Sequence, residues 1–135
     1  MSGKISTKIG IVGADTTFLI DFFKGEEPAV EFMRKYARVL RVSELVIYEF
    51  LCGNLSSDDQ ALFFDAIQSF SAVAFNREAA VHASELYRKG KSSGKTINHQ
   101  DCMIAGSYLA HGVSHIVTRN KQHFHNMKGI NVLDY

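Results

Sequence analysis

Two hydrophobic periods alternate along the chain, one typical of buried strands and one typical of amphipathic helices. Residues 8–14 are a mainly apolar run rich in β-branched side chains, and the run stops at Asp15. From residue 16 the apolar positions follow a helical period instead, which predicts a buried strand leading into a helix over residues 16–23. The apolar positions on one face of that helix are Phe18, Leu19, Phe22 and Phe23.

The same alternation continues to the end of the chain. Further strands are predicted at residues 39–42, 71–75, 114–118 and 130–133, and further helices at residues 28–36, 43–53, 56–70, 77–89 and 98–110. Residues 90–96 are predicted to form a flexible basic loop. Strands that alternate with helices pair in parallel through right-handed crossovers, so helices should cover both faces of the sheet. The pattern therefore predicts one α/β domain over residues 1–135, a three-layer α/β/α sandwich with a central, mainly parallel sheet of four or five strands.

Composition and charge narrow the class of protein. The chain has 135 residues, 46% of them hydrophobic, and a formal net charge of +1. No run approaches the roughly 20 apolar residues that span a bilayer, and residues 1–7 lack the apolar segment of a signal peptide, so we expect a cytoplasmic protein without a membrane anchor. Cys52 and Cys102 lack zinc or redox spacing and are expected to be small buried side chains within helices.

A charge of +1 provides no general attraction to nucleic acid, so binding of that kind would depend on local basic patches. Two groups are candidates for contacts with phosphates, and both are equally consistent with solvent-exposed helix faces. They are Arg34, Lys35, Arg38 and Arg41 in the first group, and Arg88, Lys89, Lys91 and Lys95 in the second.

Three acidic residues are candidates for chemistry. Ligands of open α/β sheets bind outside the carboxyl ends of the strands, where Asp15 lies, although Asp is also a common helix N-cap. Glu49 borders the apolar face of its helix, where an exposed glutamate is the ordinary alternative. Asp101 lies in a first helical turn, where the helix dipole favours an acid in any protein. Each carboxylate taken alone has a structural explanation.

Four segments, taken together and in this order, resemble the PIN-domain ribonucleases, in particular the compact VapC-type toxins. They are residues 15–21 (DTTFLID), residues 43–53 with Glu49, residues 101–105 (DCMIA) and residues 117–124 (VTRNKQHF). The resemblance implies a central parallel sheet, an acidic pocket for Mg²⁺ or Mn²⁺, and endonucleolytic hydrolysis of RNA phosphodiester bonds. It assigns the catalytic positions to Asp15, Glu49, Asp101 and Asn120, and Thr118 matches the threonine usual before the last of them.

The resemblance also implies a division of roles. Divalent metals held by carboxylates activate water and neutralise phosphate charge, and Mg²⁺ takes oxygen ligands. Asp15 and Asp101 are expected to anchor the metal, with Glu49 as a further ligand or water-positioning base and Asn120 as a neutral orienting group. Thr16, Thr118 and His123 are the candidates for positioning the substrate. His123 stands at a position where the family often has another acid. Three roles are possible for it: a neutral metal ligand, a contact to a phosphate, or a surface residue without a role in the site.

Partners follow from the same resemblance. The helices predicted in the middle of the chain, at residues 43–53 and 56–70, carry more apolar residues than packing against one face of the sheet requires. This excess suggests a surface that a partner protein covers. The resemblance implies a homodimer through these helices and a small antitoxin over the acidic groove, as in a type II toxin–antitoxin pair. The alternative is a catalytically weak PIN-like module that binds RNA or protein, and His123 in place of an acid favours this alternative slightly.

Overall fold

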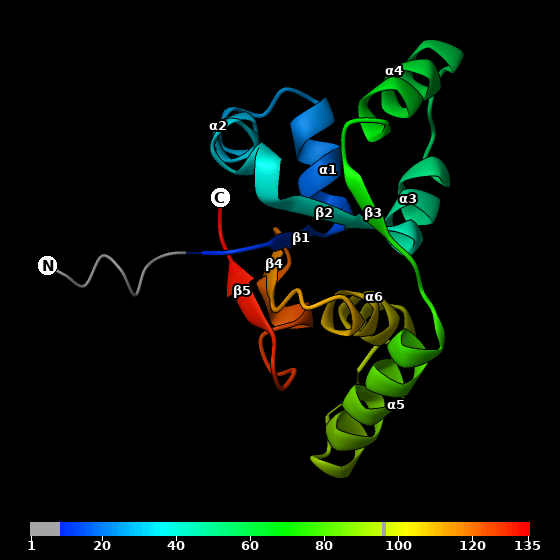
Figure 1. Ribbon diagram of the computed structural model, residues 1–135, viewed down its shortest axis with the longest axis vertical. Helices are drawn as coiled ribbons and strands as arrows, with labels where there is room; N and C mark the ends of the chain where they lie inside the picture. The colour runs from blue at the N-terminus through cyan, green and yellow to red at the C-terminus, as the bar shows by residue number, and fades with distance from the viewer. Residues whose placement is uncertain (1–8, 96) are drawn as a thin grey trace, which may run out of the picture.

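A parallel sheet forms the centre of the protein. The computed structural model describes residues 9–95 and 97–135, so the predictions for residues 1–8 and for Thr96 lie outside the described residues. The sheet has five strands in the order β3-β2-β1-β4-β5, and every neighbouring pair is parallel (Figure 1). The strands are β1 (Val12–Ala14), β2 (Leu40–Ser43), β3 (Ser71–Val73), β4 (His115–Val117) and β5 (Asn131–Leu133).

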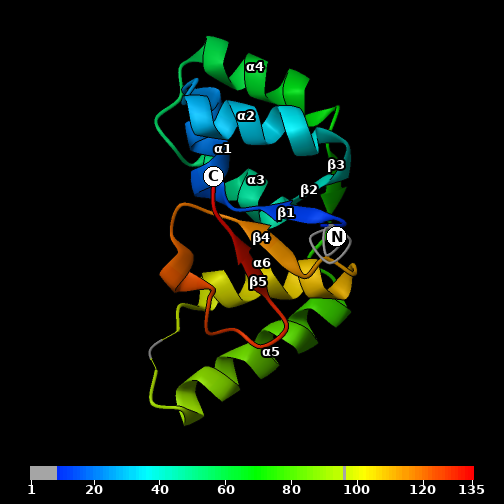
Figure 2. The ribbon, with the colours of Figure 1, turned by 90° about the vertical axis from the view of Figure 1, so that its left-hand side faces the viewer.

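Helices cover both faces of this sheet, as Figure 2 shows. On one face lie α1 (Thr16–Phe23), α2 (Glu27–Tyr36), α3 (Glu44–Leu51) and α4 (Ser57–Ile67), and on the other α5 (Arg77–Ser92) and α6 (His99–Ala110). Two 3₁₀ turns, η2 (Ala37–Val39) and η3 (Lys121–His123), precede β2 and follow β4. The predicted three-layer α/β/α sandwich with a parallel sheet is confirmed, and the weakest predicted strand, at residues 130–133, is the edge strand β5.

The strand register brings the carboxyl ends of β1, β2 and β4 to one edge. Ala14 at the end of β1 is level with Val42 on one side and Val117 on the other. The N–H of Asp15 continues this ladder by donating to the carbonyl oxygen of Val117 at 3.0 Å. Side chains that follow these strands therefore start from neighbouring points, as expected for parallel strands.

The core fills both sides of the sheet. Consecutive residues of the central strands, such as Ile116 and Val117, are fully buried because helices cover both faces of the sheet, and burying each such aliphatic side chain contributes roughly 1.5–3 kcal/mol. The largest side chains that are completely buried include Phe18, Leu19, Phe63, Ile104, Tyr108, Ile116 and Phe124. Together they hold the helices that carry the candidate site residues against the sheet.

Helices α5 and α6 pack unusually closely. Gly106 makes this possible, since a Cβ atom there would lie 2.6 Å from the backbone oxygen of Ala79 and 2.7 Å from the backbone nitrogen of Ala83. Any side chain at position 106 would push the two helices apart. The pairing fixes the position of α6, which carries Asp101.

Some boundaries and side chains differ from the predictions. Helix α5 continues to Ser92, so the prediction of a loop from residue 90 is wrong; the helix continues because Gly90 is buried against the side chain of Ile97. Cys102 is buried as predicted, whereas Cys52 is exposed because α3 ends just before it. Within the described residues, no helix combines the length and the apolar character that crossing a membrane requires.

Candidate active site

Asp15 lies at the carboxyl end of β1 with its side chain held by two threonines. Its Oδ2 atom accepts hydrogen bonds from Thr118 Oγ1 at 2.7 Å and from Thr17 Oγ1 at 3.1 Å. Although Asp15 occupies the N-cap position of α1, its side chain makes no capping hydrogen bond. The alternative that this carboxylate caps the helix is therefore wrong, and another explanation is needed for a carboxylate that is only 5% exposed.

The threonines form a small network beneath the strand ends. Thr118 is completely buried, and its hydroxyl also accepts a hydrogen bond from the N–H of Asn120 at 3.0 Å. Thr17 accepts from the N–H of Arg119 at 3.0 Å, and the two threonine hydroxyls are 3.2 Å apart. Thr17 was not identified as a site residue from the sequence. The only indication in the sequence was that two threonines follow Asp15. The network ties α1 to the residues after β4 and fixes the Asp15 carboxylate.

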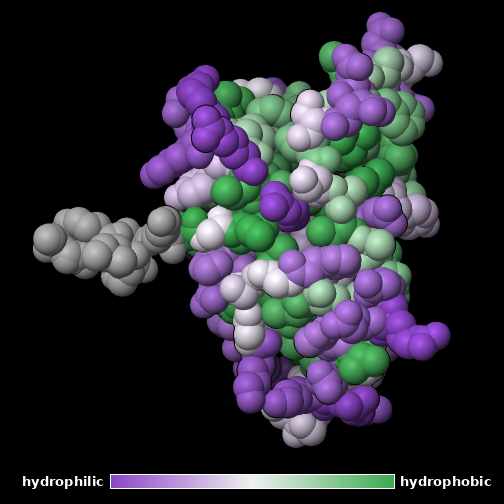
Figure 3. Space-filling view, in the orientation of Figure 1, coloured by the Kyte–Doolittle hydropathy of each residue, from purple (hydrophilic) through white to green (hydrophobic). Residues whose placement is uncertain are grey.

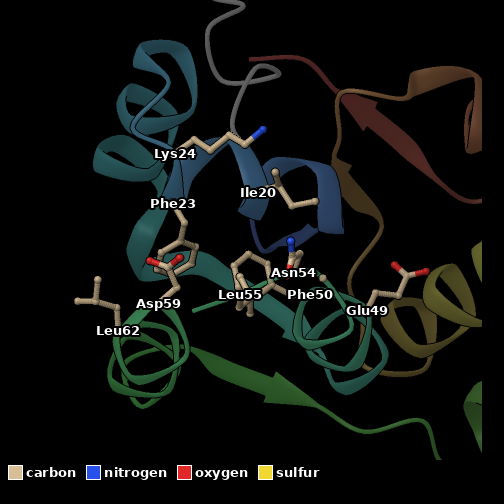
Figure 4. A pocket seen from close by; sticks show the side chains of 10 residues that line it. Ile20, Phe23, Lys24, Glu49, Phe50, Asn54, Leu55, Asp59 and Leu62 are labelled. Atoms are coloured by element: carbon tan, nitrogen blue, oxygen red, sulfur yellow. The ribbon is translucent and has the colours of Figure 1, made fainter. Parts of the chain in front are cut away.

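Glu49 reaches the same edge from α3. This helix starts directly after β2 because Ser43 caps it, with its Oγ accepting from the N–H of Leu45 at 3.1 Å. Thr16 donates a hydrogen bond from its hydroxyl to Glu49 Oε1. Figure 4 shows the Glu49 side chain leaving α3 on the side that faces α6. Glu44, on the same helix, is exposed, so only one of the two glutamates faces the strand ends.

Asp101 reaches the edge from the first turn of α6. The N-cap of that helix is Asn98, whose Oδ1 accepts from the N–H of Asp101 at 3.1 Å. The side chain of Asp101 is therefore not required for capping. Its Oδ2 lies 3.4 Å from Nδ1 of His123, and the Asp101 side chain is 17% exposed.

The electrostatics of Asp101 connect the three carboxylates. The pKa of Asp101 is raised to about 6, chiefly by burial; His123 opposes the shift, and the nearby carboxylates of Asp15 and Glu49 add to it. Like charges raise one another's pKa only when they are close enough to interact. The structure thus brings Asp15, Glu49 and Asp101 into one acidic environment at the carboxyl ends of the strands.

A buried tyrosine links two strand ends at this edge of the sheet. The Tyr108 hydroxyl donates to the carbonyl oxygen of Ala14 and accepts from the N–H of Ser43 at 2.9 Å. Burial raises the pKa of Tyr108 far above its usual value, so the hydroxyl stays protonated. No sequence signal pointed to this side chain, which joins the ends of β1 and β2 directly beside Asp15.

Two other predicted site residues lie at the margin. Asn120 is half-buried, and its side chain makes no hydrogen bond within the described part of the chain. His123 is 44% exposed, and its ring is directed at Asp101. The structure therefore brings the backbone of Asn120 into the threonine network and places His123 next to one acid.

The donor set suits a hard divalent ion, although the carboxylates do not enclose a site in this conformation. Across residues 9–95 and 97–135, no three His, Cys, Asp or Glu side chains are gathered closely enough to bind a metal ion. The Glu49 carboxylate is directed at Thr16 and that of Asp101 at His123. Three carboxylates that share one acidic environment are nevertheless the oxygen ligands that Mg²⁺ and Mn²⁺ prefer.

The raised pKa of Asp101 predicts a specific pH dependence of stability. Because the folded protein favours protonated Asp101, this carboxyl stabilises the fold fully below pH 4, and the contribution is lost as the pH rises to about 6. In chelator, Asp101→Asn is expected to match the wild type at pH 3.5 and to exceed its free energy of unfolding by about 1–2 kcal/mol at pH 7.5, allowing for solvent screening. Urea denaturation at both pH values measures this. A difference between the two proteins that does not change with pH would contradict the prediction.

Comparison with known proteins adds an independent observation. The family model of the PIN domain matches residues 14–130 of the chain. No curated protein matches the sequence at a significant level.

Several solved structures share the fold. DNA-bound VapBC from Salmonella typhimurium superposes with a TM-score of 0.83 at 22% sequence identity, covering 93% of this chain and 98% of that chain. VapBC2 from Rickettsia felis, bound to a fragment of promoter DNA, has a TM-score of 0.80 at 16% identity, with the same coverage of 93% and 98%. A toxin–antitoxin complex from Klebsiella pneumoniae has a TM-score of 0.75 at 20% identity, covering 89% and 95%.

Proposed function

Because this chain belongs to the PIN-domain family, we propose that it is a metal-dependent endoribonuclease and the toxin of a type II toxin–antitoxin pair. PIN domains are generally nucleases, so hydrolysis of a phosphodiester is the reaction class. The observation that supports the proposal is that Asp15, Glu49 and Asp101 extend from the end of β1, from α3 and from the start of α6 toward one edge of the sheet, where Thr17 and Thr16 hold the first two. RNA as the substrate rests on the resemblance of the four sequence segments to VapC-type toxins.

Asp15 and Asp101 are proposed to hold the metal, Mg²⁺ or Mn²⁺, with Glu49 as a third oxygen donor. When bound, such an ion lowers the pKa of a coordinated water and neutralises charge on the phosphodiester. Thr118 and Thr17 orient the Asp15 carboxylate through their hydrogen bonds, so we assign Thr118 to positioning Asp15.

The remaining polar residues are assigned by their surroundings. Thr16 holds Glu49 at the site, and the Glu49 carboxylate either binds the ion or accepts a proton from the attacking water. Asn120 is assigned to orienting the substrate at the end of β4. His123, exposed beside Asp101, is assigned to contact a phosphate of the RNA.

An apolar groove next to the acids is proposed as the antitoxin site. The groove lies between α1, α3 and α4 and has a volume of about 350 Å³. Ile20, Phe23, Phe50 and Leu62 line it, and Glu49 lies at one end, as Figure 4 shows. An amphipathic segment laid here would cover the acidic edge. The similar structures are toxin–antitoxin complexes, which supports a partner of this kind.

Exposed apolar residues on α3 and α4 support the proposed homodimer. Tyr48 is 62% exposed, Leu62 63% and Phe64 49%. Figure 3 shows hydrophobic residues gathered in the region between α2 and α4 on one face of the molecule. An exposed apolar surface of this kind is typical of protein interfaces.

The test of the nuclease activity is cleavage of a mixed RNA pool by the purified protein with Mg²⁺, with Mn²⁺ and with chelator. Cleavage is expected with either metal and should stop in chelator. Light scattering on the same sample measures its mass against the 15.1 kDa chain, which reveals a dimer or a co-purified inhibitor. A folded sample free of other proteins that cleaves nothing with either metal would overturn the proposal and favour the binding module.

A further inference from the structure

A second groove, between α5 and α6, takes no part in the proposed chemistry. Its volume is about 270 Å³, and its lining includes Phe75, Tyr87, Arg88, His99 and Met103. This is slightly smaller than the roughly 300 Å³ at which pockets for drug-sized ligands begin. The groove therefore has room for one small group, and its lining combines aromatic, apolar and basic side chains.

An aromatic stack forms part of the groove. The rings of Tyr87, on α5, and His99, the first residue of α6, are 4.1 Å apart between centroids and inclined by only 15°. His99 is exposed, so the stack is accessible from solvent, while Tyr87 is half-buried. Aromatic rings accessible at a protein surface are the platforms on which unpaired bases stack.

A cation without an acidic partner lies next to this stack. Arg88 is exposed, and its guanidinium donates to the hydroxyl of Ser84 at 3.4 Å. Within the described residues, no carboxylate lies within 4.0 Å of it. An aromatic platform together with an available arginine is the composition of sites for single-stranded nucleic acid, in which rings bind bases and cations bind phosphates.

The groove and the acidic site lie on two sides of the same helix end. His99 and Asp101 are two residues apart in α6, which separates them by about 3 Å along the axis and about 200° around it. On the side of Asp101, another cavity of about 430 Å³ is lined by Asp101, His123 and Lys95, among others. An RNA strand that crosses the start of α6 can therefore present a phosphate to Asp101 and a neighbouring base to the groove.

We propose that the groove between α5 and α6 binds one unpaired base of the RNA substrate, close to the phosphate that is cleaved. The exposed ring of His99, which is backed by Tyr87, provides the stacking surface, and Arg88 binds an adjacent phosphate. This inference rests on the proposed function, because it names a substrate subsite of the same nuclease. It further implies that the protein selects single-stranded RNA, since a paired base cannot enter the groove.

The experiment measures RNA binding separately from cleavage. In an Asp15→Asn background with chelator, the affinity for a fluorescent unstructured octaribonucleotide is expected to fall about tenfold with His99→Ala, and to be largely retained with His99→Phe, which keeps a ring. Arg88→Ala is expected to weaken binding, whereas Arg77→Ala, which removes an exposed arginine from the other end of α5, is the matched control. Thermal melts of each variant show whether it remains folded.

An abasic scan of the oligonucleotide gives the decisive readout. Removing the base at one position is expected to weaken binding to the parent about tenfold and to have little further effect on His99→Ala, because the same contact is already lost. If the wild type cleaves RNA and the Asp15→Asn parent binds it, but no single abasic position distinguishes that parent from its His99→Ala variant, the subsite is overturned and the nuclease stands. If the wild type neither cleaves nor binds any RNA, both proposals fail.

Discussion

Replacing Asp15 by asparagine is expected to lower RNA cleavage about a thousandfold or more without lowering the stability of the metal-free protein. The loss follows because a carboxylate that anchors a divalent ion supports several kcal/mol of charge stabilisation in the transition state. Stability is retained because the oxygen of asparagine can accept the same hydrogen bonds from Thr118 and Thr17. Removing one of three neighbouring negative charges also relieves repulsion. Cleavage rates with Mg²⁺, together with thermal melts in chelator, measure both effects.

A matched variant shows whether a loss of cleavage comes from the site itself or from the change in the net charge of the protein. Asp65 is an exposed acid on α4, away from the strand ends, so Asp65→Asn changes the net charge equally and should leave cleavage unchanged. A large loss of melting temperature for Asp15→Asn in chelator would show that the carboxylate has a structural role. Cleavage equal to that of the wild type would remove Asp15 from the proposed mechanism.

Much of the fold followed from the sequence because its signals are local. The change from a β-branched apolar run to a helical period at Asp15 marks the end of β1 and the start of α1. Parallel pairing then follows from the alternation of strands and helices, and it brings the residues after β1 and β4 to one edge. This is why Asp15 and Asn120, far apart in the chain, could be placed at the same edge. Their catalytic roles stay predictions.

The contacts that hold the site residues were not predictable. The hydrophobic period of a sequence indicates which side chains are buried, but it does not indicate which residues they contact. The bond from Thr118 to Asp15 joins residues 103 positions apart, and the bond from Tyr108 to Ala14 joins residues 94 apart. Tyr108 reads in the sequence as one more apolar helix position. The stack of Tyr87 on His99 likewise depends on how closely α5 packs against α6, which Gly106 permits. Local rules cannot show such a close approach.

The second large effect is expected from Gly13→Ala in β1, which should lower the free energy of unfolding by about 3 kcal/mol. A Cβ atom at this position would lie 2.7 Å from three ring carbons of Tyr108, a side chain that is completely buried. Overpacking of this kind costs about 1–3 kcal/mol. Displacing the ring also endangers its hydrogen bond with the N–H of Ser43, and an unpaired buried donor costs about 1–3 kcal/mol more.

Thermal unfolding of the metal-free protein measures the effect, and a fall of about 10 °C in Tm is expected for a domain of this size. Gly10→Ala is the control, because a Cβ atom at residue 10 would meet no atom within 4 Å. A second substitution, Tyr108→Leu, should make the cost of Gly13→Ala smaller, since the ring that causes the overlap is gone. If Gly13→Ala costs as much beside leucine as beside tyrosine, the contact with the ring is not the cause. In that case Tyr108 does not set the spacing of the strand ends beside Asp15.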